Sequence, residues 1–79
     1  MTKKHFILTA NVLRNRAKAI KNSGASDKEK HYALFELRSV MYHFSELFAQ
    51  ENSRFDEIAF LEACKVEKYL KQYNILLEI

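Results

Sequence analysis

The sequence predicts an all-α fold, a small bundle of three or four helices. Apolar side chains recur at steps of three and four along most of the chain, which is the period of an amphipathic helix. The chain has no proline and a single glycine, Gly24, so it lacks the turn residues that strand-rich architectures need. Its 79 residues suffice for one hydrophobic core. Residues 1–79 are therefore expected to form a single helical domain.

The first helix is expected from Thr2 to about Asn22. Its apolar stripe alternates steps of four and three and consists of Phe6, Ala10, Leu13, Ala17 and Ile20. Thr2 is a suitable N-cap. The Asn22-Ser23-Gly24 cluster predicts the end of the helix, with Gly24 in the left-handed conformation that follows many last turns.

The second helix is expected to begin after Ser26 and to reach about Gln50. Ser26 and Glu29 have the spacing of a capping box, in which each side chain bonds the backbone amide of the other residue. The predicted core stripe is widened by Val40 and Leu47 and consists of Leu34, Leu37, Met41, Phe44 and Phe48. A helix that is apolar around so much of its circumference is expected at the centre of a bundle.

A third helix is expected to begin near Arg54. Ser53 and Asp56 repeat the capping-box spacing with the shorter acid. The predicted inner face holds Phe55, Ala59, Phe60, Ala63 and Cys64. Beyond it, helical spacing resumes through Val66, Tyr69, Leu70, Tyr73 and Leu77. A bend is expected near Lys65, and the spacing leaves open whether this last stretch continues the third helix or forms a fourth.

The charge of the chain is divided unevenly along its length. Residues 1–26 carry six basic side chains and no acid, whereas residues 27–79 carry seven bases and ten acids, so the net charge of +3 combines +6 with −3. Arg14, Lys18 and Lys21 follow one another at four and three, which places them on one stripe, expected opposite the core. Together with Arg16 they are the candidate contact for nucleic acid or an acidic partner; a merely solvated helix face is the alternative.

Nothing in the sequence predicts catalysis, a metal or a cofactor. His31 and His43 are twelve residues apart on one helix and His5 lies on another, so they do not form a set of metal ligands. Cys64, the single cysteine, falls on an apolar face and is expected in the core. One glycine is too few for a phosphate-binding loop or a nucleophile elbow. The protein is not expected to be an enzyme.

Aromatic residues are plentiful for so small a domain, with six phenylalanines and four tyrosines. Tyr32, Phe35 and Tyr42 fall outside the predicted core stripe of the second helix. Surplus aromatic side chains of this kind often mark a protein–protein interface that is buried in the complex. These three are the candidate protein interface, either with another protein or in a homodimer.

The sequence also favours a cytoplasmic protein without a membrane anchor. No run approaches the ~18 apolar residues that span a bilayer, and Phe6-Ile7-Leu8 is too short for a signal-peptide core. The basic, acid-free start has the composition of a mitochondrial transit peptide, but its regular apolar stripe favours a structural helix.

Two segments resemble short, mostly uncharacterised reading frames carried by bacteriophages, prophages and plasmids. They are the opening Met1-Thr2-Lys3-Lys4-His5-Phe6, and Asn52-Ser53-Arg54-Phe55-Asp56 followed by Phe60 and Ala63-Cys64. Those proteins pair an M-T-K-x-H-F start with an N-P-R-F-D-x-x-x-F-x-x-A-C end. This chain has Ser53 where proline is common, Lys65 where glycine is common, and an added stretch from Val66 to Ile79.

The resemblance implies an accessory protein of a phage or mobile element. Small phage proteins without chemistry usually occupy the surface of a host protein, and anti-defence inhibitors, including anti-CRISPR proteins, are one such class. The expected function is therefore non-catalytic binding to a host or mobile-element protein. The alternative is nonspecific nucleic-acid binding through the basic first helix.

Overall fold

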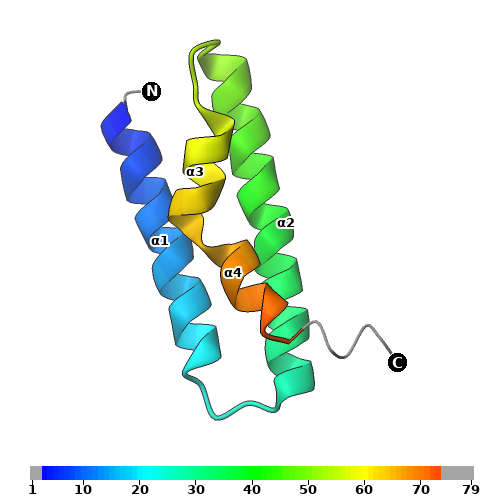
Figure 1. The fold of residues 1–79 in the computed structure, drawn as a ribbon. Coiled ribbons are helices and arrows are strands. Elements are labelled where there is room, and N and C mark those ends of the chain that lie inside the picture. Colours follow the sequence, from blue (N-terminus) through cyan, green and yellow to red (C-terminus); the bar gives the residue numbers. More distant parts are fainter. Residues whose placement is uncertain (1–2, 74–79) are drawn as a thin grey trace.

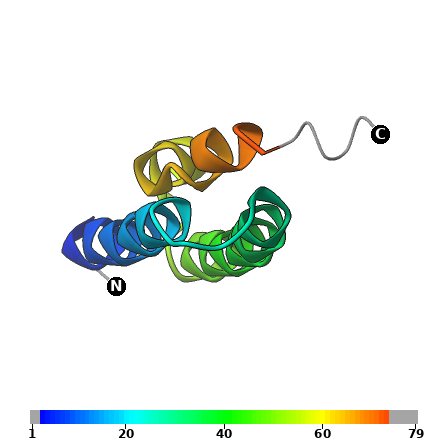
Figure 2. The same ribbon diagram turned by 90° about the horizontal axis from the view of Figure 1, so that it is seen from below.

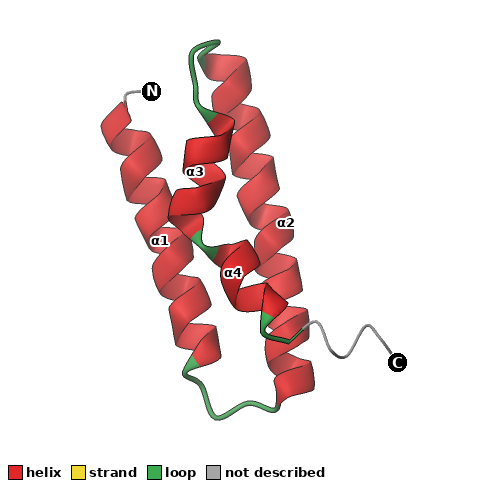
Figure 3. Cartoon of the chain, viewed as in Figure 1, coloured by secondary structure: helices red, strands yellow, loops and turns green. Residues whose placement is uncertain are grey.

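The computed structural model describes residues 3–73 and confirms the all-α prediction (Figures 1 and 3). Residues 3–73 contain no strand. The four helices are α1 (Lys3–Lys21), α2 (Asp27–Glu51), α3 (Glu57–Cys64) and α4 (Val66–Lys71).

The helices form two layers. α1 and α2 run antiparallel as a long hairpin, and the shorter α3 and α4 follow one another along one face of that hairpin (Figures 1 and 2). The described chain measures 40 × 23 × 15 Å along its principal axes. The described part of the chain is thus a flat slab, and within residues 3–73 no helix covers the second face of the hairpin (Figure 2).

The end of α1 depends on a serine. The Ser23 backbone amide and hydroxyl both donate to the Ile20 carbonyl, at 3.2 and 2.7 Å, and they satisfy an acceptor that the last turn leaves unpaired. Gly24 does not adopt a positive φ, so the expected left-handed glycine is wrong. The predicted N-cap, Thr2, lies outside the described residues.

The start of α2 confirms the predicted capping box. The Glu29 amide donates to Ser26 Oγ at 3.2 Å, and the Ser26 amide donates to Glu29 Oε1 at 3.1 Å. The helix ends at Glu51, one residue beyond the expected position. The Asn52 amide donates to the Phe48 carbonyl as the chain leaves the last turn.

The predicted start of the third helix is wrong by three residues. Phe55 N–H donates to the Asn52 carbonyl at 3.0 Å, which closes a turn over residues 52–55 and keeps Ser53 out of the capping position. Asp56 is the N-cap instead, since its Oδ1 accepts from the Ala59 amide at 3.0 Å. Asn52 Oδ1 also accepts from the Arg54 amide at 2.9 Å, which steadies the turn.

The expected bend at Lys65 is confirmed and separates two helices. Lys65 has φ 58° and ψ 12°, the left-handed conformation that serves as C-cap of α3. α4 starts at the next residue and takes a different direction (Figure 1). The structure therefore decides in favour of a fourth helix over residues 66–71.

The core runs along the line where the hairpin meets α3 and α4. Its most buried members come from all four helices and include Ala17, Leu34, Met41, Phe48, Cys64 and Val66. Phe44, Val40 and Leu47, which were expected in or beside the core stripe, are exposed. Among residues 3–73, other helices cover the hairpin on one face only, so part of the wide apolar stripe of α2 stays exposed.

Candidate functional site

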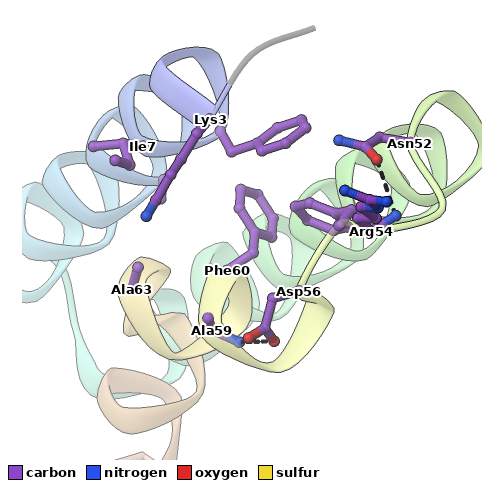
Figure 4. A pocket seen from close by; sticks show the side chains of 11 residues that line it. Lys3, Ile7, Asn52, Arg54, Asp56, Ala59, Phe60 and Ala63 are labelled. Carbon is purple, nitrogen blue, oxygen red and sulfur yellow. Dashed lines mark hydrogen bonds between the residues drawn. The ribbon is translucent and has the colours of Figure 1, made fainter.

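An apolar groove lies between α1 and α3, and we call it the α1–α3 groove (Figure 4). Its volume of about 370 Å³ lies at the lower end of the range for ligand pockets. The lining residues come from α1, the turn after α2, and α3: Lys3, Phe6, Ile7, Ala10, Asn52, Arg54, Phe55, Asp56, Ala59, Phe60 and Ala63.

The floor of the groove is a cluster of packed rings. The Phe6 and Phe55 ring centroids are 4.7 Å apart in an edge-to-face arrangement, and Phe55 and Phe60 are 5.5 Å apart. All three also lie within 5.5 Å of the buried Phe48 ring. Edge-to-face rings hold one another in place, so the floor is preformed.

The rim of the groove is positively charged. Lys3 and Arg54 stand on opposite sides of Phe60 (Figure 4). Within residues 3–73, Arg38 and Glu67 form the only ion pair. Neither Lys3 nor Arg54 therefore has an acidic partner among these residues. The one lining acid, Asp56, caps α3 through Oδ1. The groove thus presents apolar surface between two unmatched positive charges.

The four basic residues singled out in the sequence do not form one patch. Arg14, Lys18 and Lys21 share a flank of α1, but Lys21 reaches α4, because its Nζ lies 5.2 Å from the Tyr69 ring centroid, while Lys18 is exposed. Arg14 and Lys21 are half-buried, so their expected position opposite the core is wrong. Arg16 is about 200° around the helix from Arg14 and borders a small hollow beside the start of α2.

The three predicted interface rings have different surroundings. Tyr32 and Phe35 are 59% and 48% exposed, and both pack against the ring of the buried His31. Tyr42 is half-buried and already engaged, since its Oη donates to Glu67 Oε1 at 3.0 Å. Two of the three rings therefore remain as open surface.

Glu67 accepts from two side chains of α2 and so fixes α4 to the hairpin. Arg38 Nε donates to the same Oε1 that accepts from Tyr42, and the Arg38 guanidinium lies 5.0 Å from the Tyr42 ring centroid. The hydrogen bond to Glu67 raises the pKa of both Arg38 and Tyr42. With every member paired to a neighbour, this cluster has a structural role.

The residues considered for catalysis or metal binding are dispersed. Within residues 3–73, no three His, Cys, Asp or Glu side chains come close enough to share a metal ion. Cys64 is fully buried, and burial raises the pKa of its thiol to about 11. A thiol in that state is almost entirely protonated at neutral pH and is a poor nucleophile.

No family model, curated protein sequence or solved structure matches this chain. Among the described helices, none is long and apolar enough to cross a membrane.

Sequence reasoning assigned the groove residues to the core and to caps and therefore missed the groove. Phe6, Phe55 and Phe60 were expected to pack, and they do so while lining the same groove. The available signal was the pair of alanines, Ala59 and Ala63, spaced four apart on α3. Small side chains at that spacing leave room beside a neighbouring helix.

Proposed function

We propose that this chain is a non-catalytic protein-binding module whose α1–α3 groove takes a large apolar side chain of a partner. The observation that supports it is the preformed ring floor between two cations, Lys3 and Arg54, that have no acidic partner within residues 3–73. Aromatic surface with arginine at its edge is typical of energetically dominant interface sites. The groove favours an anchor residue flanked by Asp or Glu, because these carboxylates complement the rim.

The partner is a host or mobile-element protein, and the module modulates a host factor or a defence complex. This part of the proposal is supported by the resemblance to phage and plasmid reading frames described above. The backbone adds one argument, since Lys65 occupies the left-handed conformation that favours glycine, the residue common at this position in those reading frames.

Selection from a random peptide library on the immobilised protein tests the groove. Ala63→Phe places a ring in the groove from the exposed rim of α3, and Glu62→Phe, the matched control, places the same ring on the exposed surface of α3. Peptides enriched on the wild type should carry a large apolar residue with Asp or Glu within two positions. They should bind the control equally and lose at least tenfold in affinity for Ala63→Phe.

The groove proposal fails if no peptide is enriched, or if the enriched peptides bind Ala63→Phe as well as they bind the wild type. For the natural partner, the same three proteins serve as baits in nuclease-treated host lysate. The relevant partner is a protein retained by the wild type and by Glu62→Phe but lost from Ala63→Phe.

Nonspecific nucleic-acid binding is the second candidate function. The supporting observation is that Arg14, Lys18 and Lys21 share one flank of α1 and that Lys21 Nζ lies 5.2 Å from the Tyr69 ring centroid, so a cation and a ring lie together at one end of that flank. Replacing these three by Gln should abolish a low-salt shift of duplex DNA and its salt dependence. Arg16→Gln is the control, because Arg16 lies on another side of α1 and should matter little. If wild-type protein at low salt shifts neither DNA nor RNA, this function is excluded.

A further inference from the structure

One side of α1 carries both the groove lining and the basic residues of its second half. Lys3, Ile7 and Ala10 line the α1–α3 groove, and Arg14 follows Ala10 by four residues. Residues three and four apart share one side of an α-helix, so the groove and the cations belong to one surface, which passes α3 and then α4 (Figure 1). We call it the α1 stripe, and its members follow one another at steps of four and three: Lys3, Ile7, Ala10, Arg14, Lys18 and Lys21.

The cations in the second half of the stripe are held by uncharged neighbours. Arg14 Nη2 donates to Asn11 Oδ1 at 2.9 Å, and Lys21 Nζ lies 5.2 Å from the Tyr69 ring centroid. Lys18, between them, is exposed. None of these contacts cancels a positive charge, so the second half of the stripe presents three charges in a row beside the groove.

The charges of the described chain are sorted between its helices in the same sense. α1 carries six cations and no acid, and residues 52–73, which include α3 and α4, carry four cations and four acids. These two parts, which lie against each other, thus have a net charge of +6 from ten cations and four acids. α2 carries three cations and five acids, a net charge of −2.

The four acids of residues 52–73 do not neutralise the stripe. Glu57 and Glu67 accept hydrogen bonds from side chains of α2, and Asp56 caps α3 through Oδ1. Glu62 comes two residues after the buried Phe60, about 200° around the helix, so it lies on the outer surface of α3. Within residues 3–73 no cation of the stripe forms an ion pair.

We propose that the α1 stripe binds an acidic polypeptide segment along its length, with an apolar anchor in the groove and further carboxylates over Arg14 and Lys18. This inference rests on the function proposed above and names the partner segment more closely. Ala10 and Lys18 are eight residues apart, about 12 Å along the helix, which about four residues of an extended chain span. The segment therefore carries Asp or Glu about three to five positions from its anchor, in addition to the carboxylates beside the anchor.

The two halves of the stripe favour a polypeptide over a nucleic acid as the acidic partner. Base stacking needs a free ring face, but the Tyr69 ring beside the cations is half-buried and has Lys21 Nζ over it. A nucleic acid would therefore contact the second half of the stripe through its phosphates and leave the apolar groove unused. An acidic polypeptide with an apolar side chain uses both halves.

Fluorescence anisotropy on the full chain with two synthetic peptides tests this proposal. Both peptides have a central tryptophan with Glu on each side. In the acidic peptide the third to sixth positions on both sides of the tryptophan are Asp or Glu, which serves either chain direction, and in the neutral peptide they are Asn or Gln. At low salt the acidic peptide should bind at least tenfold more tightly, and the difference should shrink as salt is added.

Two double variants locate the effect. Arg14→Gln with Lys18→Gln should remove most of the difference between the peptides and leave the affinity for the neutral peptide unchanged. Arg16→Gln with Lys30→Gln, the matched control, removes the same charge from the hollow between α1 and α2 and should preserve the difference. Should the first double variant unfold, Lys18→Gln alone, at an exposed position, should lower the affinity for the acidic peptide about threefold.

Equal binding of the two peptides to the wild type would overturn the inference and leave the groove proposal standing. An equal loss in the control double variant would also overturn it, because the effect would then come from net charge alone. A 20-nucleotide DNA single strand that binds the same surface more tightly than the acidic peptide would assign the stripe to nucleic acid. Failure of the groove itself has a different sign: Ala63→Phe would then bind both peptides as tightly as the wild type does, or neither peptide would bind.

Discussion

Phe48 is the side chain on which α1, α2 and α3 converge. Its ring centroid lies 4.8 Å from Phe6, 5.5 Å from Phe55 and 5.4 Å from Phe60, and the residue is 98% buried. The rings of Phe6, Phe55 and Phe60 form the floor of the α1–α3 groove, and all three pack against Phe48. Structure and proposed binding thus depend on the same residue.

Phe48→Ala should therefore cost about 3–5 kcal/mol, the usual range for a buried phenylalanine. That is a large part of the 5–15 kcal/mol by which typical domains are stable. Urea denaturation followed by circular dichroism measures the loss. Phe35→Ala, on the exposed side of α2, is the control and should cost less than ~1 kcal/mol. Equal losses in the two variants would contradict the central place given to the ring cluster.

Cys64 makes the free energy of unfolding depend on pH in the alkaline range. Burial raises the pKa of its thiol from 9.0 to about 11, so between these values the unfolded chain loses the proton while the folded chain keeps it. The contribution of this thiol to the free energy of unfolding is therefore fully present below about pH 9 and decreases as the pH rises toward 11. Tyr42, whose pKa is also raised, contributes in the same direction.

The measurement is urea denaturation of the wild type and of Cys64→Ala from pH 8 to pH 11. The difference in unfolding free energy between the two proteins should shrink as the pH rises, since only the wild type loses the thiol contribution. The native thiol should also react slowly with a disulfide reagent at neutral pH and rapidly once urea unfolds the chain. A fast reaction in the native state would show that the thiol is accessible.

At the level of elements, two connections have residues that do not suit their backbone. Ser53 is the second residue of the turn that the Phe55–Asn52 hydrogen bond closes, a position where proline is favoured. Lys65 has φ 58°, where a side chain is strained and glycine is not. Both connections flank α3, so they determine how this helix is held against the hairpin.

Ser53→Pro and Lys65→Gly should each raise the unfolding free energy, by about 0.4–1 kcal/mol. Proline restricts the unfolded chain, and glycine relieves the left-handed strain. The two sites lie at opposite ends of α3, so the gains should add in the double variant. Thermal denaturation checks this, with Glu62→Pro inside α3 as a strongly destabilising comparison. A loss of stability in Ser53→Pro would mean that the turn needs the Ser53 amide.

For the whole molecule, α3 and α4 act as one covering layer over the hairpin. Buried residues extend from the ring cluster beside α3 to Leu70 and Tyr73 at the end of the described chain. Two carboxylates of this layer bind α2, one to Ser45 at 2.8 Å and one to Arg38 and Tyr42. The core is therefore continuous from one end of the slab to the other.

Unfolding should accordingly be one cooperative transition, whichever end is weakened. Phe60→Ala beside α1 and Leu70→Ala near the far end should each cost about 2–5 kcal/mol. In both variants the transitions followed by circular dichroism and by tyrosine fluorescence should coincide. Separate transitions in Leu70→Ala would show that α4 unfolds independently of the ring cluster.

The sequence by itself determined where the chain is helical, because helix formation depends on local signals such as apolar spacing and capping residues. The three-and-four spacing predicted the helical stretches but left their number at three or four, and the capping box at Ser26 placed the start of α2 to the residue. Errors occurred where two local signals compete. Ser53 and Asp56 both suit an N-cap, and the turn closed by Asn52 decided for Asp56.

Only the tertiary structure decided which apolar and basic faces are covered. Tyr42 and Lys21 looked like free surface residues in the sequence, yet Glu67 and Tyr69 of α4 engage them. Phe44 looked like core, yet it is 37% exposed. Periodicity states which side chains share a face of one helix, but coverage depends on where distant segments pack. The groove between α1 and α3 and the open side of the hairpin follow from that packing alone.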